Sequence, residues 1–202
     1  MPHPDPAQKP PRLEQILDVA ARQFRARGYA AVSMRDIATE AGIRGPSLYY
    51  HFAAKDDLVI AVMNRGIEVV REAVAAALDA LPVDADTATR LASAMRTHLR
   101  ALHGLSDYTS ANVRIFGQLP EALRRANMAE RRAYETIWSD LLAPTCANPA
   151  LLPARTAFVI GALNATLEWV DPARGDLAAL SDHISRLLLN GLLATEAEET
   201  PT

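Results

Sequence analysis

Cysteine is nearly absent from this 202-residue chain, and so are the motifs of most enzymes. The single cysteine, Cys146, excludes an intrachain disulfide framework and favours a reducing compartment, the cytoplasm. No Cys/His cluster has zinc-site spacing, and there is no glycine-rich phosphate loop, nucleophile elbow or HExxH string. His98 and His103 are five residues apart, so they would not share a helix face as a metal pair does. We expect no metal, no cofactor and no enzymatic activity, although a Ser/His/Asp site built from scattered residues stays open.

Long hydrophobic runs are also missing. No stretch of 18 uninterrupted apolar residues is available for a membrane span, and residues 1–11 lack the basic-then-apolar order of a signal peptide. Half of the residues are nevertheless apolar, which allows a substantial core in one large domain or two small ones. We therefore expect a cytoplasmic globular protein that does not bind membranes.

The sequence shows no β-strand alternation and no internal repeat. Apolar residues recur instead at i, i+3, i+4 and i+7, broken by proline and glycine, which predicts an all-α fold. About nine helices are expected, over residues 12–27, 33–41, 46–52, 55–81, 87–105, 108–118, 120–142, 153–170 and 177–195.

The stretch from Ser33 to Lys55 predicts a helix-turn-helix. Ser33 and Asp36 can close a capping box at the start of its first helix, and Gly42 can end that helix with a positive φ. Pro46 suits the first turn of the second helix, on which Leu48 and Phe52 point inward. The opposite face carries side chains that suit a DNA groove: arginine can fork onto guanine, and hydroxyl groups can reach bases or phosphates.

At these residues the chain resembles the TetR family of bacterial transcription factors. The matching residues run from Phe24 to Ala38, continue at Ala41-Gly42-Ile43 and from Leu48 to Phe52, and end with Lys55-Asp56-Asp57-Leu58. The resemblance implies a three-helix DNA-binding domain (12–58) and a helical effector-binding and dimerisation domain (59–195). The five prolines of residues 1–11 predict a flexible arm, which the resemblance does not require, and residues 196–202 form a short polar tail.

The resemblance also implies which residues contact DNA. Base or nearby backbone contacts are expected from Arg35, Arg44, Gly45, Ser47 and Tyr49, and phosphate contacts from Ser33, Thr39, Tyr50, His51 and Lys55. Lys55 lies beside the start of a long helix, where a cation and unpaired N–H groups together can grip a phosphate. The competing interpretation is that Tyr49 or Tyr50 packs beneath the second helix of the helix-turn-helix, which would read the DNA bases. In this interpretation His51 is a hydrogen-bonding residue at the edge of the core.

The N-terminal part of the chain carries a net positive charge, as a DNA-binding domain requires. The whole chain carries −3, but residues 1–55 hold eight Lys/Arg against five Asp/Glu, and the remainder holds 13 against 19. The basic part coincides with the predicted reading domain, although so small an excess can also arise by chance.

A ligand cavity is implied between the helices of the second domain. Its candidate lining consists of apolar side chains with a few polar groups, although each taken singly is more typical of ordinary core. These residues are Met95, His98, Leu99, Leu102, Asn112, Phe116, Tyr134, Trp138, Phe158, Asn164 and Trp169. They suggest a mainly apolar effector. Arg124, Arg125, Arg131 and Arg132 would attract the phosphates of an acyl-CoA, but a basic run on a helix is also typical of a solvated face.

The last two predicted helices carry apolar stripes, which fit either the protein's own core or a partner helix. The resemblance favours a homodimer that joins these helices in a four-helix bundle and reads a palindromic operator. The sequence thus predicts a DNA-binding transcriptional regulator, a repressor released by its ligand. The alternatives are an activator of the same fold and a helical protein-interaction module without a specific operator.

Overall fold

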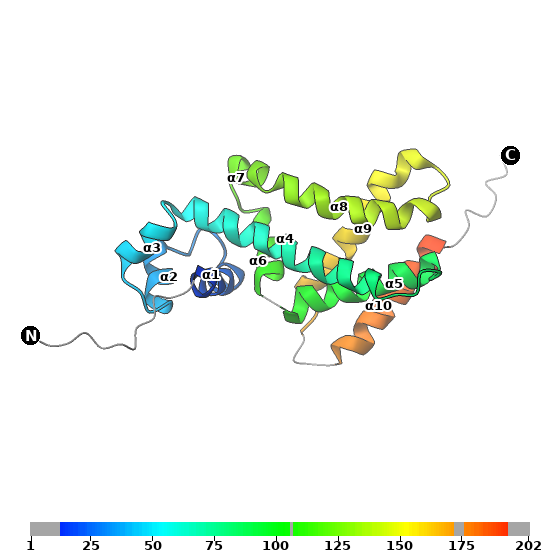
Figure 1. The fold of residues 1–202 in the computed structure, drawn as a ribbon, viewed down its shortest axis with the longest axis horizontal. Helices are drawn as coiled ribbons and strands as arrows, with labels where there is room; N and C mark the ends of the chain where they lie inside the picture. The colour runs from blue at the N-terminus through cyan, green and yellow to red at the C-terminus, as the bar shows by residue number, and fades with distance from the viewer. Residues whose placement is uncertain (1–12, 106, 172–175, 194–202) are drawn as a thin grey trace, which may run out of the picture.

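The computed structural model describes residues 13–105, 107–171 and 176–193, and the regular elements in these ranges are all helices (Figure 1). The predicted all-α fold is confirmed, whereas the expected arm (1–11), the tail (196–202) and the last residues of the final helix lie outside the described residues. The α-helices are α1 (Leu13–Arg27), α2 (Met34–Glu40), α3 (Gly45–His51), α4 (Lys55–Asp79), α5 (Thr87–Arg100), α6 (Asp107–Phe116), α7 (Glu121–Ala126), α8 (Met128–Leu142), α9 (Leu152–Ala165) and α10 (Leu177–Leu193). A π-helical turn, Ala101–Leu105, follows α5, and short 3-10 turns are Ala143–Thr145, Pro149–Leu151 and Thr166–Glu168.

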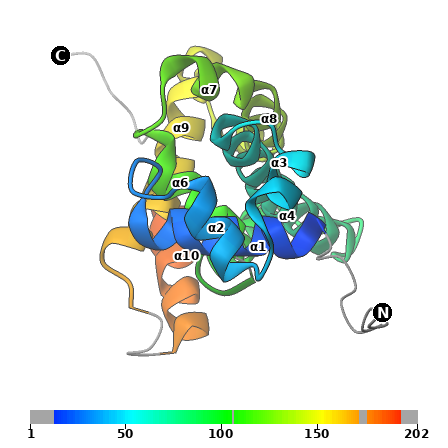
Figure 2. The same cartoon turned by 90° about the vertical axis from the view of Figure 1, so that its left-hand side faces the viewer.

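The first three helices form as their local signals predict. Gly28 and Gly42 adopt φ values of 78° and 69°, the left-handed conformation that lets the chain leave α1 and α2 abruptly. The capping box at α2 is present: the Asp36 N–H donates to Ser33 Oγ at 3.2 Å, and the Ser33 N–H donates to Asp36 Oδ2 at 3.0 Å. Pro46 lies in the first turn of α3. Figure 2 views this end of the molecule, where α2 and α3 lie in front of α4.

Helix α4 connects two hydrophobic cores. Its 25 residues give a rod of about 37 Å at 1.5 Å per residue, which runs from α3 to the far end of the molecule (Figure 1). Leu58, Val62 and Met63 pack in a core with α1, α2, α3 and α6. Val70 and Val74 pack in a second core with α5, α8, α9 and α10. Since α6 also contributes to the first core, the predicted boundary at residue 58 does not separate the packing, and the two-domain division stays a prediction.

The predicted helix over residues 120–142 is two helices. Asn127 ends α7, and its side chain is completely buried. Its Nδ2 donates to Asn64 Oδ1 of α4 at 2.7 Å, which fixes the break against the long helix. The prediction of one continuous helix was wrong. The hydrogen bond that fixes the break joins residues 63 positions apart, and helical periodicity does not indicate contacts between residues so distant in the sequence.

Helices α9 and α10, and the segment that follows α9, expose large apolar side chains. Phe158 is 65% exposed, Trp169 61% and Leu187 60%. The stretch Pro149–Glu168 is long and apolar enough to cross a membrane by length and composition only, and 28% of its apolar 18-residue window is buried. An apolar helix that is covered on one side alone is typical of an interface with another protein chain.

Candidate functional site

Helix α3 turns its chemically active side chains outward. Leu48 is completely buried and Phe52 is 9% exposed, so these two side chains hold the helix on the first core. Arg44, Ser47 and His51 are exposed, and Gly45 is half-buried. Tyr49 is 56% exposed and Tyr50 is 87% exposed, so the interpretation that either ring packs beneath the helix was wrong. The side chains of α3 that are expected to contact DNA are therefore accessible to solvent.

Helix α2 adds Ser33, Arg35 and Thr39 to this surface, all of them exposed. The Ser33 hydroxyl also caps α2, and the hydrogen bond that the Asp36 carboxylate accepts from the Ser33 N–H lowers the pKa of the Asp36 carboxyl. Arg22 of α1 forms an ion pair with Glu40 of α2 at 2.7 Å. Ser33 thus has a structural role as well as its predicted phosphate contact.

Lys55 points back into the protein. Its Nζ donates to the carbonyl oxygens of Tyr29 at 2.9 Å and Val32 at 3.0 Å, and it lies 4.1 Å from the centroid of the Tyr29 ring. The ammonium group therefore braces the loop between α1 and α2. Two of its three N–H bonds are occupied in this way, so the phosphate contact expected from Lys55 stays a prediction that rests on the third.

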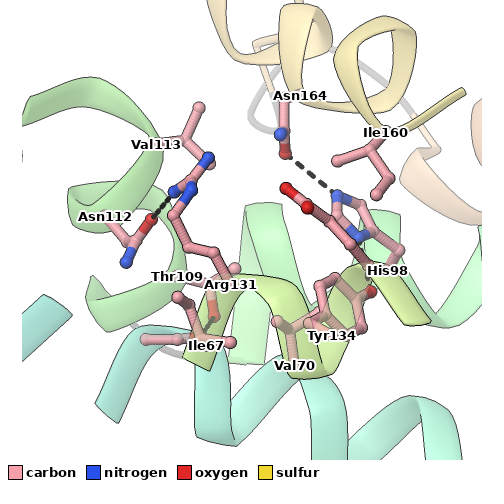
Figure 3. A pocket seen from close by; sticks show the side chains of 12 residues that line it. Ile67, Val70, His98, Thr109, Asn112, Val113, Arg131, Tyr134, Ile160 and Asn164 are labelled. Atoms are coloured by element: carbon pink, nitrogen blue, oxygen red, sulfur yellow. Dashed lines mark hydrogen bonds between the residues drawn. The ribbon is translucent and has the colours of Figure 1, made fainter. Parts of the chain in front are cut away.

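A small cavity of about 40 Å³ lies between α4, α5, α6, α8 and α9 (Figure 3). Its walls combine apolar side chains with a few polar groups, as in most small-molecule sites. The lining residues are Gly66, Ile67, Val70, His98, Thr109, Asn112, Val113, Arg131, Tyr134, Glu135, Ile160 and Asn164.

One wall of the cavity carries a chain of three polar side chains. His98 Nδ1 lies 2.8 Å from Tyr134 Oη, and His98 Nε2 lies 3.1 Å from Asn164 Oδ1 (Figure 3). Burial lowers the pKa of His98 to about 4, and burial also raises the pKa of Tyr134. The imidazole is therefore neutral at pH 7, with one donor and one acceptor nitrogen.

The opposite wall is formed by Arg131 and Asn112. The Arg131 guanidinium lies 3.9 Å from the centroid of the Phe116 ring and donates to Asn112 Oδ1 at 3.0 Å (Figure 3). Burial lowers the pKa of Arg131. Asn112 Nδ2 in turn donates to the Met63 carbonyl oxygen of α4 at 2.7 Å. A partly buried cation is thus linked through one amide to the long helix.

Four of the predicted ligand-binding residues line this cavity: His98, Asn112, Tyr134 and Asn164. Phe116 lies beneath Arg131, outside the lining. The predictions for Phe158 and Trp169 need correction, because α9 and the segment after it turn both side chains to the surface. The remaining candidates fill the core without lining the cavity; they are Met95, Leu99, Leu102 and Trp138.

The sequence interpretation missed the contribution of α4 and gave Arg131 no special position. Helical spacing marks Ile67 and Val70 as inward-facing but does not distinguish a cavity wall from core. Gly66, in the middle of a long helix, was the one available signal, since glycine there costs about 1 kcal/mol relative to alanine unless close packing requires it. The other missed lining residues are Thr109, Val113, Glu135 and Ile160.

Helix α6 connects the cavity to α1, which packs in one core with the helix-turn-helix pair α2 and α3. Thr109 and Asn112 line the cavity. On the side of α6 that faces α1, the Tyr108 hydroxyl donates to Asp18 Oδ1 at 2.6 Å, and Asp107 forms an ion pair with Arg25. A change in the cavity that moves α6 would therefore also move α1.

Within the described ranges, no group of three or more His, Cys, Asp or Glu side chains is arranged to hold a metal ion. The two surfaces with suitable chemistry are the exposed face of α2 and α3 and the cavity. The first presents arginine, hydroxyl and imidazole groups to solvent, and the second lines a space of about 40 Å³ with apolar side chains and a few hydrogen-bonding groups.

Two protein-family models match most of the chain. Residues 16–62 match the model described as "Bacterial regulatory proteins, tetR family". Residues 84–192, more than half of the chain, match the model described as "Tetracyclin repressor-like, C-terminal domain". The two matches fall on the reading helices and on the helices that surround the cavity.

A relative of known function also has a similar sequence. The HTH-type transcriptional repressor KstR2 of Rhodococcus jostii (strain RHA1) is 39% identical over 82 residues, which are 39% of this chain and 40% of that protein. The match thus spans about two fifths of that relative's length.

Solved structures share the fold over nearly the whole chain. The transcriptional regulator FadR from Bacillus subtilis in complex with stearoyl-CoA has a TM-score of 0.76 at 21% identity, and the match covers 89% of this chain and 99% of that one. AibR in complex with isovaleryl coenzyme A and operator DNA has a TM-score of 0.74 at 22% identity, and the match covers 89% of this chain and 97% of that one. At these identities the likeness establishes the fold.

Proposed function

The chain belongs to the TetR family of bacterial regulatory proteins, and from this premise we propose that it is a transcriptional repressor that leaves its operator when an acyl thioester enters the cavity. The observation that carries the DNA-binding part is the exposed face of α3. Arg44, Ser47, Tyr49 and Tyr50 point to solvent while Leu48 holds the helix from beneath. Side chains with these donors can read base edges in a major groove and hold the flanking phosphates.

The repressor acts as a homodimer joined through α9 and α10. Phe158 of α9 and Leu187 of α10 are more than half exposed, at 65% and 60%, and Leu151 is 48% exposed. Burying these side chains against a second copy removes apolar surface from water and sets the distance between two copies of α3. Two reading helices about 34 Å apart fit successive major grooves of a palindromic operator.

The effector belongs to the acyl-CoA class. Two proteins of the same fold have structures with stearoyl-CoA and isovaleryl coenzyme A, and the cavity here offers apolar walls with a few polar groups. Outside the cavity, Arg125 and Arg132 of α7 and α8 are exposed and Arg124 is half-buried, and such cations suit the phosphates of coenzyme A. The family relatives are regulators, and we propose that the chain has no catalytic activity and acts in the cytoplasm, where the DNA is.

Release follows from a shift between two arrangements of the dimer. An effector in the cavity favours the arrangement in which α6 and α4 hold the α3 helices at a spacing that no longer fits successive grooves. A hundredfold drop in operator affinity requires about 2.7 kcal/mol of differential effector binding.

Selection of operators from random duplex DNA by the full chain tests the proposal. We expect a palindromic consensus, and dissociation when isovaleryl-, octanoyl- or stearoyl-CoA is added. Binding without any consensus would support a helical interaction module instead, and tighter operator binding with acyl-CoA would support an activator. Either result would contradict the proposal that the protein is a repressor released by acyl-CoA.

A further inference from the structure

Arg131 is a partly buried cation whose hydrogen-bond partner is a neutral amide. Among the described residues, the ion pairs within 4.0 Å do not include Arg131. Its hydrogen bond goes to Asn112 Oδ1 at 3.0 Å, and its flat face lies on Phe116. Glu135, one turn further along α8, acts on the guanidinium electrostatically and is exposed to solvent. The guanidinium carries five N–H donors, so it can accept a further partner on its cavity side.

The opposite wall also presents donors. The neutral His98 has a single N–H, and its Nε2 lies 3.1 Å from an oxygen, Asn164 Oδ1, so Nε2 carries the hydrogen. Its Nδ1 then accepts the hydrogen of the Tyr134 hydroxyl. Because Oδ1 is the atom of Asn164 that faces His98, the Nδ2 group of Asn164 points away from the ring (Figure 3). Arg131 and Asn164 both line the cavity, and both side chains carry N–H donors. The Thr109 hydroxyl is directed to the Gly66 carbonyl oxygen at 3.1 Å.

We propose that Arg131 and Asn164 bind the acyl oxygen of the effector, and that Arg131 exchanges its Asn112 partner for this oxygen. The inference rests on the proposed function and names the part of the effector that the cavity recognises. A carbonyl oxygen has two lone pairs and no charge, so it matches two donors on opposite walls. A phosphate would be far more costly to desolvate beside Ile67, Val70 and Ile160. The phosphates of the thioester stay outside.

The exchange gives the effector a route to the reading helices. With Arg131 drawn away, Asn112 loses the partner of its Oδ1, while its Nδ2 still contacts the Met63 carbonyl oxygen of α4. A buried amide oxygen without a partner raises the free energy of this arrangement, which favours a movement of α6 that hydrates or re-pairs the oxygen.

Comparison of an acyl-CoA with the matching S-alkyl thioether of coenzyme A tests the assignment, because the thioether lacks only the acyl oxygen. Calorimetric titration gives the Kd of both compounds for the wild-type protein, Arg131→Gln and Arg132→Gln, at the acyl length that binds best. Arg132 is the exposed neighbour of Arg131 on α8, so its variant has the same net charge as Arg131→Gln. Any phosphate contact of Arg132 is common to both compounds, so its loss weakens both equally and leaves the ratio of their Kd values unchanged. The free carboxylate and octanol are titrated as well. The carboxylate distinguishes binding of an acid from binding of a thioester, and octanol distinguishes binding of a hydroxyl from binding of a carbonyl.

The wild type and Arg132→Gln are expected to bind the thioester at least tenfold more tightly than the thioether. Arg131→Gln should bind the two within twofold of each other, because the partner of the oxygen is gone. Equal affinity of the wild type for both compounds, or an equal loss of both in Arg131→Gln, would overturn the inference while leaving an acyl-CoA effector intact.

A second variant guards against an Arg131→Gln protein that does not fold. Asn164→Asp keeps the acceptor for His98 and removes the amide donors, and it should weaken the thioester several-fold while leaving the thioether unchanged; an unchanged thioester contradicts the assignment. A wild-type protein that binds no acyl-CoA at all would remove the proposed effector class and this inference with it.

Discussion

Gly66 of α4 and Tyr108 at the start of α6 approach so closely that no side chain fits between them. A Cβ on Gly66 would lie 2.5 Å from the carbonyl oxygen of Tyr108 and 3.0 Å from Cβ of Asn112. Thr109 donates to the Gly66 carbonyl oxygen at the same crossing. The two helices that border the cavity therefore meet backbone to backbone, and this contact lies on the path between the cavity and the reading helices.

Gly66→Ala should force α4 and α6 apart. The clash is with backbone and cannot be relieved by a rotamer change, so we expect a loss of about 1–3 kcal/mol in the free energy of unfolding, measured with urea. Gly104→Ala is the control, because its Cβ would meet no atom within 4 Å. An unchanged stability of Gly66→Ala would show that the crossing is looser than described.

Tyr108→Phe should weaken the coupling between effector and operator. The substitution removes the hydrogen bond to Asp18 of α1, worth about 1–3 kcal/mol for a charged acceptor, and leaves the ring in place. The Kd for acyl-CoA should be unchanged, while the ratio of operator affinities without and with effector should fall about tenfold in a fluorescence-anisotropy titration. A full response in this variant would exclude the α1 contact as the route.

Lys55→Met and Arg44→Ala should have different effects on stability and on DNA binding. Lys55 holds the Tyr29 and Val32 carbonyl oxygens, so its loss should destabilise the reading helices by about 1–2 kcal/mol and weaken binding to every DNA sequence alike. Arg44 is exposed at the start of α3, and its loss should leave the melting temperature unchanged and reduce the preference for the operator over random DNA. Equal, unselective effects of both variants would contradict these roles.

His98 should make the protein less stable in acid. Its pKa is about 4 in the fold, below the ordinary value of 6.5, so the unfolded chain binds the proton more readily between these pH values. Stability is therefore unaffected by His98 above pH 6.5 and falls as the pH drops towards 4. Between pH 7.5 and 5.0 the loss should be about 2 kcal/mol in urea unfolding.

His98→Gln should remove this part of the pH dependence, because glutamine does not titrate. His51→Gln is the control, since His51 is exposed on α3. The same pH slope in wild type and His98→Gln would mean that other groups cause it.

Phe158→Glu should convert the dimer to a monomer. A carboxylate at the exposed apolar face of α9 must be desolvated in the proposed interface, which costs several kcal/mol. Sedimentation equilibrium measures the change. Val83→Glu, at a side chain that is 102% exposed on the loop after α4, should stay dimeric. A wild type that sediments as a monomer would contradict the proposed assembly.

The helices of the reading domain could be predicted because their signals are local. The Ser33–Asp36 capping box spans three residues, and Gly28, Gly42 and Pro46 act on the backbone at their own positions. The outward direction of Tyr49 and Tyr50 was less certain, because helical spacing leaves both positions near the edge of the buried face.

The cavity could be predicted only in part. His98, Asn112, Tyr134 and Asn164 were chosen as polar or aromatic residues on apolar helix faces, and they do meet. Phe158 satisfied the same criterion and is on the surface. Periodicity shows which faces are apolar but cannot separate a face that meets the core from one that meets another chain.

The sequence by itself determined the first three helices and the turns between them, because short-range backbone preferences and capping act within a few residues. Tertiary structure decided that Lys55 turns inward to a loop 26 residues earlier and that Arg131 leaves the solvated face to bind Asn112, 19 residues away. Such contacts depend on how α4, α6 and α8 cross, and helix crossings follow from the packing of many side chains at once.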